Sequence, residues 1–145
     1  KKKKNLTTDG VITPHTATET INIGVFAGVS YTASDGEYVY SKFWPSGTVA
    51  TDIVAYVYDD PYIVYRIQSA GTPAQTDVGA NADVVASAGS TTTGQSGFNL
   101  NGTMSNGTAT CKIIGLWEDP SNSFAQYAQL EVLINEHILK QTAGI

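Results

Sequence analysis

The side chains that could carry out chemistry in this chain are few and widely separated. Of its two histidines, His15 lies near the beginning and His137 near the end, and neither stands at a spacing typical of serine hydrolases. The phosphate-binding patterns GxGxxG and GxxxxGK[ST] do not occur, and neither do the metal or redox patterns HExxH and CxxC. We therefore predict no catalytic, cofactor-binding or metal-binding residue, and no enzyme activity.

Paired carboxylates are the remaining candidates for chemistry, because they could bind calcium or act as an acid and a base. The pairs are Asp59-Asp60, Asp77 with Asp83, and Glu118-Asp119. Adjacent acids on one strand point to opposite faces, so joint use requires a loop. Two of the pairs precede proline, where acids commonly accept hydrogen bonds from turn amides. We expect turn capping rather than calcium binding or glycosidase chemistry.

The charge distribution disfavours nucleic-acid partners. The net charge is -5, and four of the eight basic residues form the terminal run Lys1 to Lys4, which we interpret as a solvated tail. The rest of the chain is acidic and has no basic stripe that could neutralise phosphates. No stretch approaches the roughly 20 apolar residues that a membrane-spanning helix needs. We predict neither a nucleic-acid nor a membrane partner.

Aromatic residues are concentrated between positions 31 and 65. They are Tyr31, Tyr38, Tyr40, Phe43, Trp44, Tyr56, Tyr58, Tyr62 and Tyr65. Tyrosine and tryptophan are enriched at protein interfaces and in sugar-binding grooves, although cross-strand pairs within the fold explain single residues equally well. In the alternating runs Tyr38/Tyr40 and Tyr56/Tyr58, both members share one strand face. The partner-binding candidates are Tyr38, Tyr40, Trp44, Tyr56, Tyr58 and Tyr62.

Length and composition predict one strand-rich domain. The 145 residues suit a single core, and charged residues make up only 14% of the chain, where about a quarter is usual. Residues 1–18 are predicted to form a flexible or extended N-terminal arm, and residues 19–145 the folded body. The expected fold is all-β: a single-domain antiparallel β-sandwich, or a jelly-roll-like β-barrel.

Alternation and turn residues predict the individual elements. A strand over 19–26 is followed by a turn at Ser34-Asp35-Gly36 and a second strand over 37–43. The strongest hairpin prediction joins 53–58 to 62–68 around Asp59-Asp60-Pro61. Further strands are expected over 83–86, 108–117 and 129–137, with the last two flanking a polar loop, and one or two helical turns after Thr72-Pro73. The single cysteine, Cys111, opens an apolar run and is expected to be buried.

Several segments together resemble the capsid decoration, or cement, proteins of tailed bacteriophages. They are Asp-Asp-Pro-Tyr-Ile-Val-Tyr-Arg-Ile-Gln at 59–68, Asp-Val-Gly-Ala-Asn-Ala-Asp-Val-Val at 77–85, Ser-Thr-Thr-Thr-Gly-Gln-Ser-Gly at 90–97, Cys-Lys-Ile-Ile-Gly-Leu-Trp-Glu-Asp-Pro at 111–120, and Glu-Val-Leu-Ile-Asn-Glu-His at 131–137. The resemblance implies a virion protein on the outer surface of the capsid. It would bind the major capsid protein shell, stabilise the head, and act as a homotrimer or homodimer at capsid symmetry axes, without a cofactor.

Three other functions remain open from the sequence. The aromatic density and acidic loops also suit a carbohydrate-binding β-sandwich, lectin-like or from a fibre, with or without calcium. A small hydrolase would need two carboxylates in a deep pocket. A different virion part, such as a fibre base or a minor coat protein, would share much of the same composition.

Overall fold

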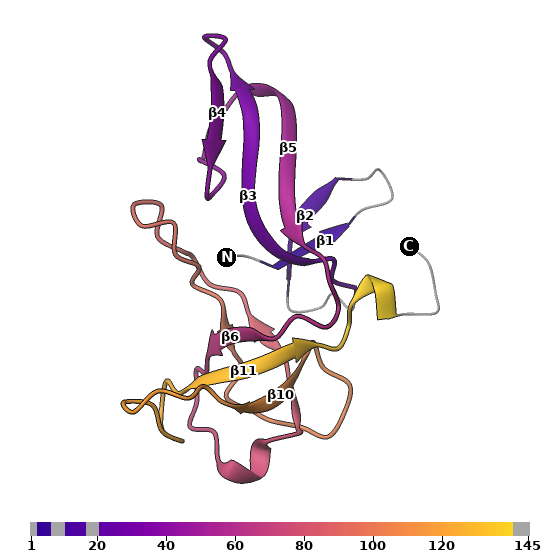
Figure 1. Ribbon diagram of the computed structural model, residues 1–145, viewed down its shortest axis with the longest axis vertical. Helices are drawn as coiled ribbons and strands as arrows, with labels where there is room; N and C mark the ends of the chain where they lie inside the picture. The colour runs from indigo at the N-terminus through magenta and orange to yellow at the C-terminus, as the bar shows by residue number, and fades with distance from the viewer. Residues whose placement is uncertain (1–2, 7–10, 17–20, 141–145) are drawn as a thin grey trace.

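In a computed structural model, the described residues are 3–6, 11–16 and 21–140 (Figure 1). The strands there are β1 (Lys3–Leu6), β2 (Ile12–Pro14), β3 (Gly24–Ala33), β4 (Tyr38–Ser41), β5 (Ala50–Tyr58), β6 (Tyr65–Gln68), β7 (Asn81–Ala82), β8 (Val84–Val85), β9 (Asn99–Leu100), β10 (Cys111–Leu116) and β11 (Gln129–Ile134). Two single 3-10 turns, η1 (Gln75–Asp77) and η2 (Ile138–Lys140), complete the elements. Neither is a helix long enough to cross a membrane, and the described chain has no other.

The strands form antiparallel sheets, as the sequence predicted. In the first sheet β3 is central: β5 pairs along one side, and β4 and the β1–β2 hairpin pair along the other. The second sheet has the order β6-β11-β10-β7, and β8 pairs with β9. The all-β prediction is confirmed, and the arrangement is consistent with a β-sandwich. The alternative of a closed barrel is wrong, because β4 and β5 end the first sheet without joining each other.

Two separate apolar clusters hold the sheets together. The larger cluster joins the second sheet to the β8–β9 pair and consists of Ala82, Val84, Leu100, Cys111, Ile113, Leu130 and Val132. The smaller one lies on the first sheet and contains Phe26, Val29 and Tyr31. In Figure 1 the strands β3, β4 and β5 project away from the rest of the molecule. Few other elements can pack against them there, which explains why their apolar cluster is small. Cys111 is fully buried, as predicted.

The predicted hairpin of 53–58 with 62–68 is wrong. β5 pairs with β3 in the first sheet, whereas β6 pairs with β11 in the second. The Asp-Asp-Pro bend itself exists, and Asp60 Oδ1 accepts a hydrogen bond from the Tyr62 backbone N–H at 2.8 Å. The bend therefore directs the chain from one sheet to the other. β3 offers β5 a partner along nearly its whole length, which a short return strand could not match.

Other elements follow the sequence with shifted bounds. The β3–β4 hairpin forms at the predicted turn, where the Gly36 N–H donates to the Ala33 carbonyl at 2.9 Å. Of the strand predicted over 19–26, residues 19 and 20 lie outside the described residues, and the strand found there, β3, begins at Gly24. The helical turns expected after Thr72 reduce to η1, where Asp77 accepts a hydrogen bond from the Ala74 N–H at 2.7 Å.

The N-terminal segment contributes strands where it is described. β1 and β2 pair with each other, and β1 also pairs with the beginning of β3. Lys1 and Lys2, which open the predicted lysine tail, lie outside the described residues. The division of the chain into an arm and a body stays a prediction.

The two sheets meet where the chain enters β3. The Asn22 N–H donates to the Glu136 carbonyl at 2.8 Å, and the Ile138 N–H donates to the Asn22 carbonyl at 2.9 Å. Asn22 is completely buried and adds a side-chain hydrogen bond to the same Glu136 carbonyl. At Gly24 the backbone has a φ of +141°, and an added Cβ would lie 1.9 Å from the Tyr58 carbonyl oxygen. Only glycine fits this crossing of β3 and β5.

His137 lies buried in this junction. Its Nδ1 accepts a hydrogen bond from the Leu139 N–H at 3.1 Å. Burial lowers the pKa of His137 and the positive charge of Lys140 lowers it further, while the Ile23 backbone and the carboxylates of the β5–β6 bend act in the opposite direction. The folded state therefore favours the neutral ring.

We expect acid to weaken the fold through His137. The pKa of His137 is lower in the folded state than in the unfolded state. Below about pH 6.5 the unfolded chain therefore binds a proton at this ring before the folded chain does, and the free energy of unfolding decreases by at most about 1.4 kcal/mol per pH unit. Above about pH 6.5 the ring is neutral in both states and this loss is absent. Urea unfolding between about pH 7.5 and 5 measures this. The variant His137→Asn, whose side-chain oxygen can accept the Leu139 bond, should flatten the dependence. An unchanged slope in H137N would contradict the assignment.

Candidate protein-docking surface

Four tyrosines and one valine form an exposed face on the first sheet, which we call the tyrosine face. Its members are Tyr38 and Tyr40 of β4, and Val54, Tyr56 and Tyr58 of β5. Strand alternation places each set on one side of its strand, and the β3 pairing brings the sets together: Ser30 lies opposite both Tyr40 and Val54. The five side chains are between 43% and 68% exposed.

Small residues of the central strand support these rings. Gly28 pairs with Tyr56, and a Cβ added at Gly28 would lie 2.5 Å from the Tyr40 hydroxyl. Ser30 is buried beneath the rings, and its Oγ lies 3.1 Å from the Tyr56 hydroxyl. The Tyr40 and Tyr56 ring centroids are 5.9 Å apart at a tilt of 48°. Because β3 carries no bulk here, the rings from the flanking strands lean toward each other across it.

The other two predicted residues lie elsewhere. Trp44 follows β4 and packs edge-on against Tyr31, with centroids 5.3 Å apart, so it lies on the opposite, core side of the sheet. Tyr62 lies in the β5–β6 bend and is 76% exposed, with Lys140 Nζ 5.2 Å from its ring centroid. The structure thus brings together four of the six residues that were predicted to bind a partner. Val54 was missed, although its alternation with Tyr56 and Tyr58 places it on the same face.

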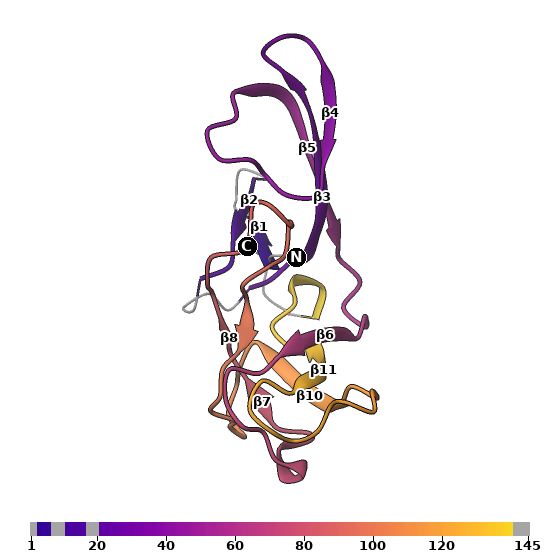
Figure 2. The ribbon, with the colours of Figure 1, turned by 90° about the vertical axis from the view of Figure 1, so that its left-hand side faces the viewer.

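A small pocket lies on the core side of the first sheet, beside Trp44. The loop between β8 and β9 rises from the second sheet toward the first in both views (Figures 1 and 2). The pocket has a volume of about 170 Å³. It is lined by residues 89–91 and 94–96 of this loop and by Pro14, Phe26, Lys42, Phe43 and Trp44. Hydrogen bonds hold the loop: the Ser90 N–H donates to Gln95, and the Gly94 N–H donates to Ser90. The pocket combines aromatic walls with hydroxyl and amide groups.

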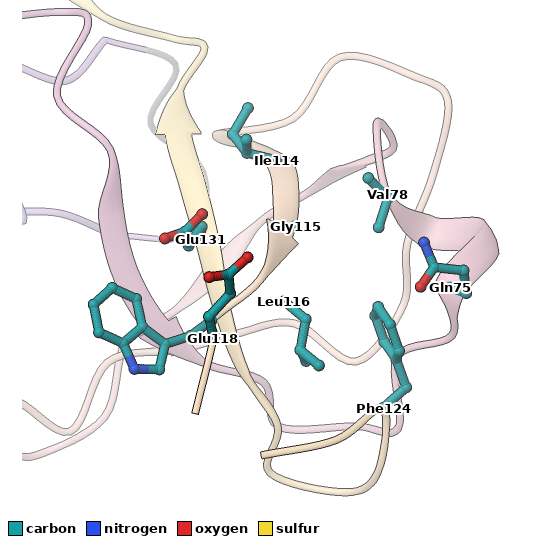
Figure 3. Close-up of a pocket in the computed structure, with 9 residues that line it drawn as sticks. Gln75, Val78, Ile114, Gly115, Leu116, Glu118, Phe124 and Glu131 are labelled. Carbon is teal, nitrogen blue, oxygen red and sulfur yellow. The ribbon is translucent and has the colours of Figure 1, made fainter. Parts of the chain in front are cut away.

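A wider groove runs beside β10 and has a volume of about 540 Å³. Figure 3 shows the carboxylates of Glu118 and Glu131 on one side of it, with Val78 and Phe124 on the other. Glu118 is exposed and Glu131 is half-buried, so neither carboxylate is enclosed. Among the described lining residues there is no histidine, cysteine or lysine that could assist them. This is a poor setting for acid and base catalysis, which depends on contrasting environments for its two groups.

Asp119 caps a turn, as predicted, whereas Asp83 bonds a distant part of the chain. Asp119 accepts hydrogen bonds from the Ser121 backbone and hydroxyl, and both bonds lower the pKa of Asp119. Asp83 accepts from the Thr110 N–H at 3.1 Å and from its hydroxyl at 3.0 Å. Within residues 3–6, 11–16 and 21–140, no three His, Cys, Asp or Glu side chains gather closely enough to hold a metal ion.

One further tyrosine connects the sheets. The Tyr65 hydroxyl on β6 donates to the Tyr58 carbonyl at the end of β5, at 3.1 Å. Burial raises the pKa of Tyr65 to about 12, and the negative charges of Asp60 and Asp59 contribute to the rise. Tyr65 is therefore a neutral donor that links the tyrosine-bearing strand to the second sheet.

Comparison with protein-family models, curated proteins and solved structures found no match to the chain. Its function is therefore inferred from the geometry of its own residues. The tyrosine face is the largest grouping of predicted site residues that this geometry brings together, and it suits contact with another macromolecule more than chemistry.

We expect the tyrosine face to contribute little to folding. Tyr40→Ala and Tyr56→Ala should each lower the free energy of unfolding by about 1 kcal/mol or less, since both rings are already largely exposed. Leu130→Ala, at a fully buried position in the larger cluster, should cost about 2–5 kcal/mol. Urea unfolding compares the three variants. Losses at Tyr40 and Tyr56 as large as that at Leu130 would show that the rings belong to the core.

Proposed function

We propose that this chain is a structural, non-enzymatic virion protein that binds the outside of a tailed-phage capsid. In this role it would cover the surface of the major capsid protein shell and stabilise the head. The observation that carries the proposal is the tyrosine face, which is large, uncharged and presented on a projecting sheet. The sequence resemblance to capsid decoration proteins supplies the identity of the partner.

The chemistry of the face supports binding to a protein surface. Tyrosine offers apolar ring area for burial and a hydroxyl that remains able to form hydrogen bonds at the edge of a contact. Such residues dominate the binding energy of many interfaces, especially when they are held in place before binding. Tyr40 and Tyr56 are held by their mutual packing and by Ser30, so little side-chain freedom would be lost on docking.

Repetition would convert a modest contact into durable attachment. A capsid presents many equivalent copies of its major protein, and a homotrimer or homodimer at a symmetry axis can engage several at once. Once one subunit is bound, the next contacts become intramolecular, which raises the overall affinity by orders of magnitude. The proposed role thus needs area and multiplicity and requires no catalytic group or cofactor.

A second candidate, carbohydrate binding, is favoured by the small pocket beside Trp44. Its aromatic walls and the polar groups of the β8–β9 loop resemble the composition of sugar-binding sites, where rings stack on the sugar and polar groups orient it. A cavity of about 170 Å³ is below the range usual for drug-sized ligands, so only a single sugar unit would fit inside it.

Binding to undecorated heads tests the first proposal. Purified chain is mixed with expanded, undecorated tailed-phage heads, and bound protein is measured by cosedimentation and cryo-EM. We expect added density at symmetry axes and greater heat resistance of the heads. The double variant Tyr40→Ala with Tyr56→Ala should weaken attachment at least tenfold, which corresponds to about 1.4 kcal/mol. Tyr62→Ala, which lies off the face, is the matched control and should attach normally.

The proposal fails if the wild-type chain does not bind such heads at all. It also fails in its choice of surface if Y62A weakens attachment while the double variant does not. Thermal melts of each variant confirm that any loss of binding occurs with the fold intact.

A glycan array separates the carbohydrate candidate from the first. If this second candidate holds, the wild-type chain should bind defined glycans, and Trp44→Ala should abolish that signal while the tyrosine double variant keeps it. Arrays with and without a calcium chelator show whether the metal takes part. An absence of signal on the array, together with binding to heads, would reject the carbohydrate candidate.

A further inference from the structure

The outer edge of β5 is open along most of its length. Among the described residues, β3 is the only strand that pairs with β5, so the backbone groups on the other side of β5 face outward. The residues along this edge are unusually apolar: Ile53 is 52% exposed, Val54 50% and Tyr56 43%. An edge strand of this kind is a ready template for pairing with another strand.

Natural edge strands usually carry features that prevent such pairing, and this one carries few. Lysine, proline and inward-pointing charge are the common devices, and none occurs between Ile53 and Val57. The β3–β5 register shifts at two places. One is next to Asp52, which has a positive φ of 52°, and the other is between Phe26 and Gly28, where the extra residue belongs to β3 and β5 continues without an insertion. The bulge next to Asp52 ends the regular stretch at one side, and the Asp59-Asp60 bend ends it at the other. The five residues 53–57 lie between these two ends, and Val54 to Val57 all pair with β3.

We propose that two copies of this chain associate by antiparallel pairing of their β5 edges about a two-fold axis at Ala55. In this register the pairs are symmetric: Ala55 faces Ala55, Val54 faces Tyr56, and Ile53 faces Val57 of the other copy. β-branched residues opposite aromatic or β-branched residues are favourable cross-strand pairs. The axis sits at the middle of the regular stretch, so both copies contribute the same five residues.

The charges around the edge disfavour a shift of the axis toward the C-terminal end of β5. With the axis at Ala55, Asp52 lies opposite Tyr58 of the other copy, and Asp59 lies opposite Thr51. Moving the axis one residue to Tyr56 would place Asp52 opposite Asp60, and like charges directly opposite are destabilising. The acidic chain can therefore pair with itself here because the paired segment is uncharged and its flanking acids avoid each other.

The two-fold axis would also align the tyrosine faces. In an antiparallel pair that continues one sheet, the axis is perpendicular to the sheet, so corresponding faces of both copies point in the same direction. The two tyrosine faces would then form one continuous surface twice as wide, with Val54 and Tyr56 at its centre. This deepens the self-association included in the proposed function, and the pairing itself is tested in the absence of any capsid.

The pairing should be weak and dependent on concentration. Five residues extend about 17 Å along a strand. A contact of this length buries less surface area than the roughly 1,200 Å² or more that stable complexes bury. We therefore expect monomer at about 1 µM and predominantly dimer at about 200 µM, an equilibrium that local crowding on a repeating surface would shift further toward dimer.

Sedimentation velocity of the full chain over that concentration range tests the proposal. The wild-type mass should rise from 15.3 kDa to twice that value. Val54→Lys, which places a charge at the centre of the contact, should remain monomeric at every concentration. Val64→Lys is the matched control, because Val64 is 49% exposed in the β5–β6 connection, and it should dimerise like the wild type. Monomer throughout, a trimer, or a dimer that V54K leaves intact would overturn the proposal.

Disulfide trapping tests the register without relying on a destabilising charge. A mixture of Val54→Cys and Tyr56→Cys chains should form a cross-linked heterodimer under mild oxidation, because these positions face each other across the axis. Either variant alone should cross-link at least tenfold more slowly, because its own two copies stand diagonally. The only natural cysteine, Cys111, is fully buried and gives no background. Equal cross-linking in the mixture and in the single variants would reject the register.

Discussion

The arrangement of this protein depends on a close backbone crossing between the two sheets. Gly24 has no Cβ, which lets β3 pass against the Tyr58 carbonyl at the end of β5. Beside it, Asn22 is hydrogen-bonded to Glu136 and Ile138, just after β11 of the second sheet. These contacts fix where the first sheet leaves the body, and therefore where the tyrosine face and the open β5 edge point. The direction of both surface features thus relies on a glycine that packs against the end of β5 and on a buried asparagine close to it in the chain.

Local signals in the sequence predicted strands well but partners less well. The turn at Ser34-Asp35-Gly36 produces a hairpin because its two strands are neighbours along the chain. The Asp-Asp-Pro bend after β5 has equally clear turn chemistry, yet it leads into a different sheet. A bend limits the direction of the backbone and says nothing about which strand completes the ladder. That choice depends on long-range pairing of β5 with β3, which local patterns do not encode.

The candidate surface was predictable in part for the same reason. Alternation along β4 and β5 placed Tyr38 with Tyr40 and Tyr56 with Tyr58, and no further information was needed for each pair. Joining the pairs required knowing that both strands flank β3, whose Gly28 and Ser30 leave room for the rings. Trp44 was grouped with them by proximity in sequence, but the chain turns after β4 and carries its ring to the opposite side of the sheet.

The unequal size of the two apolar clusters has a consequence for cooperativity. The cluster on the first sheet has three buried side chains, whereas the larger cluster has seven, so the projecting strands form the subdomain more prone to local opening. Any molecule that covers those strands binds only their closed form and shifts the opening equilibrium toward it. A bound partner would thus act as a missing layer of the fold, and attachment and rigidity of this subdomain would be thermodynamically linked.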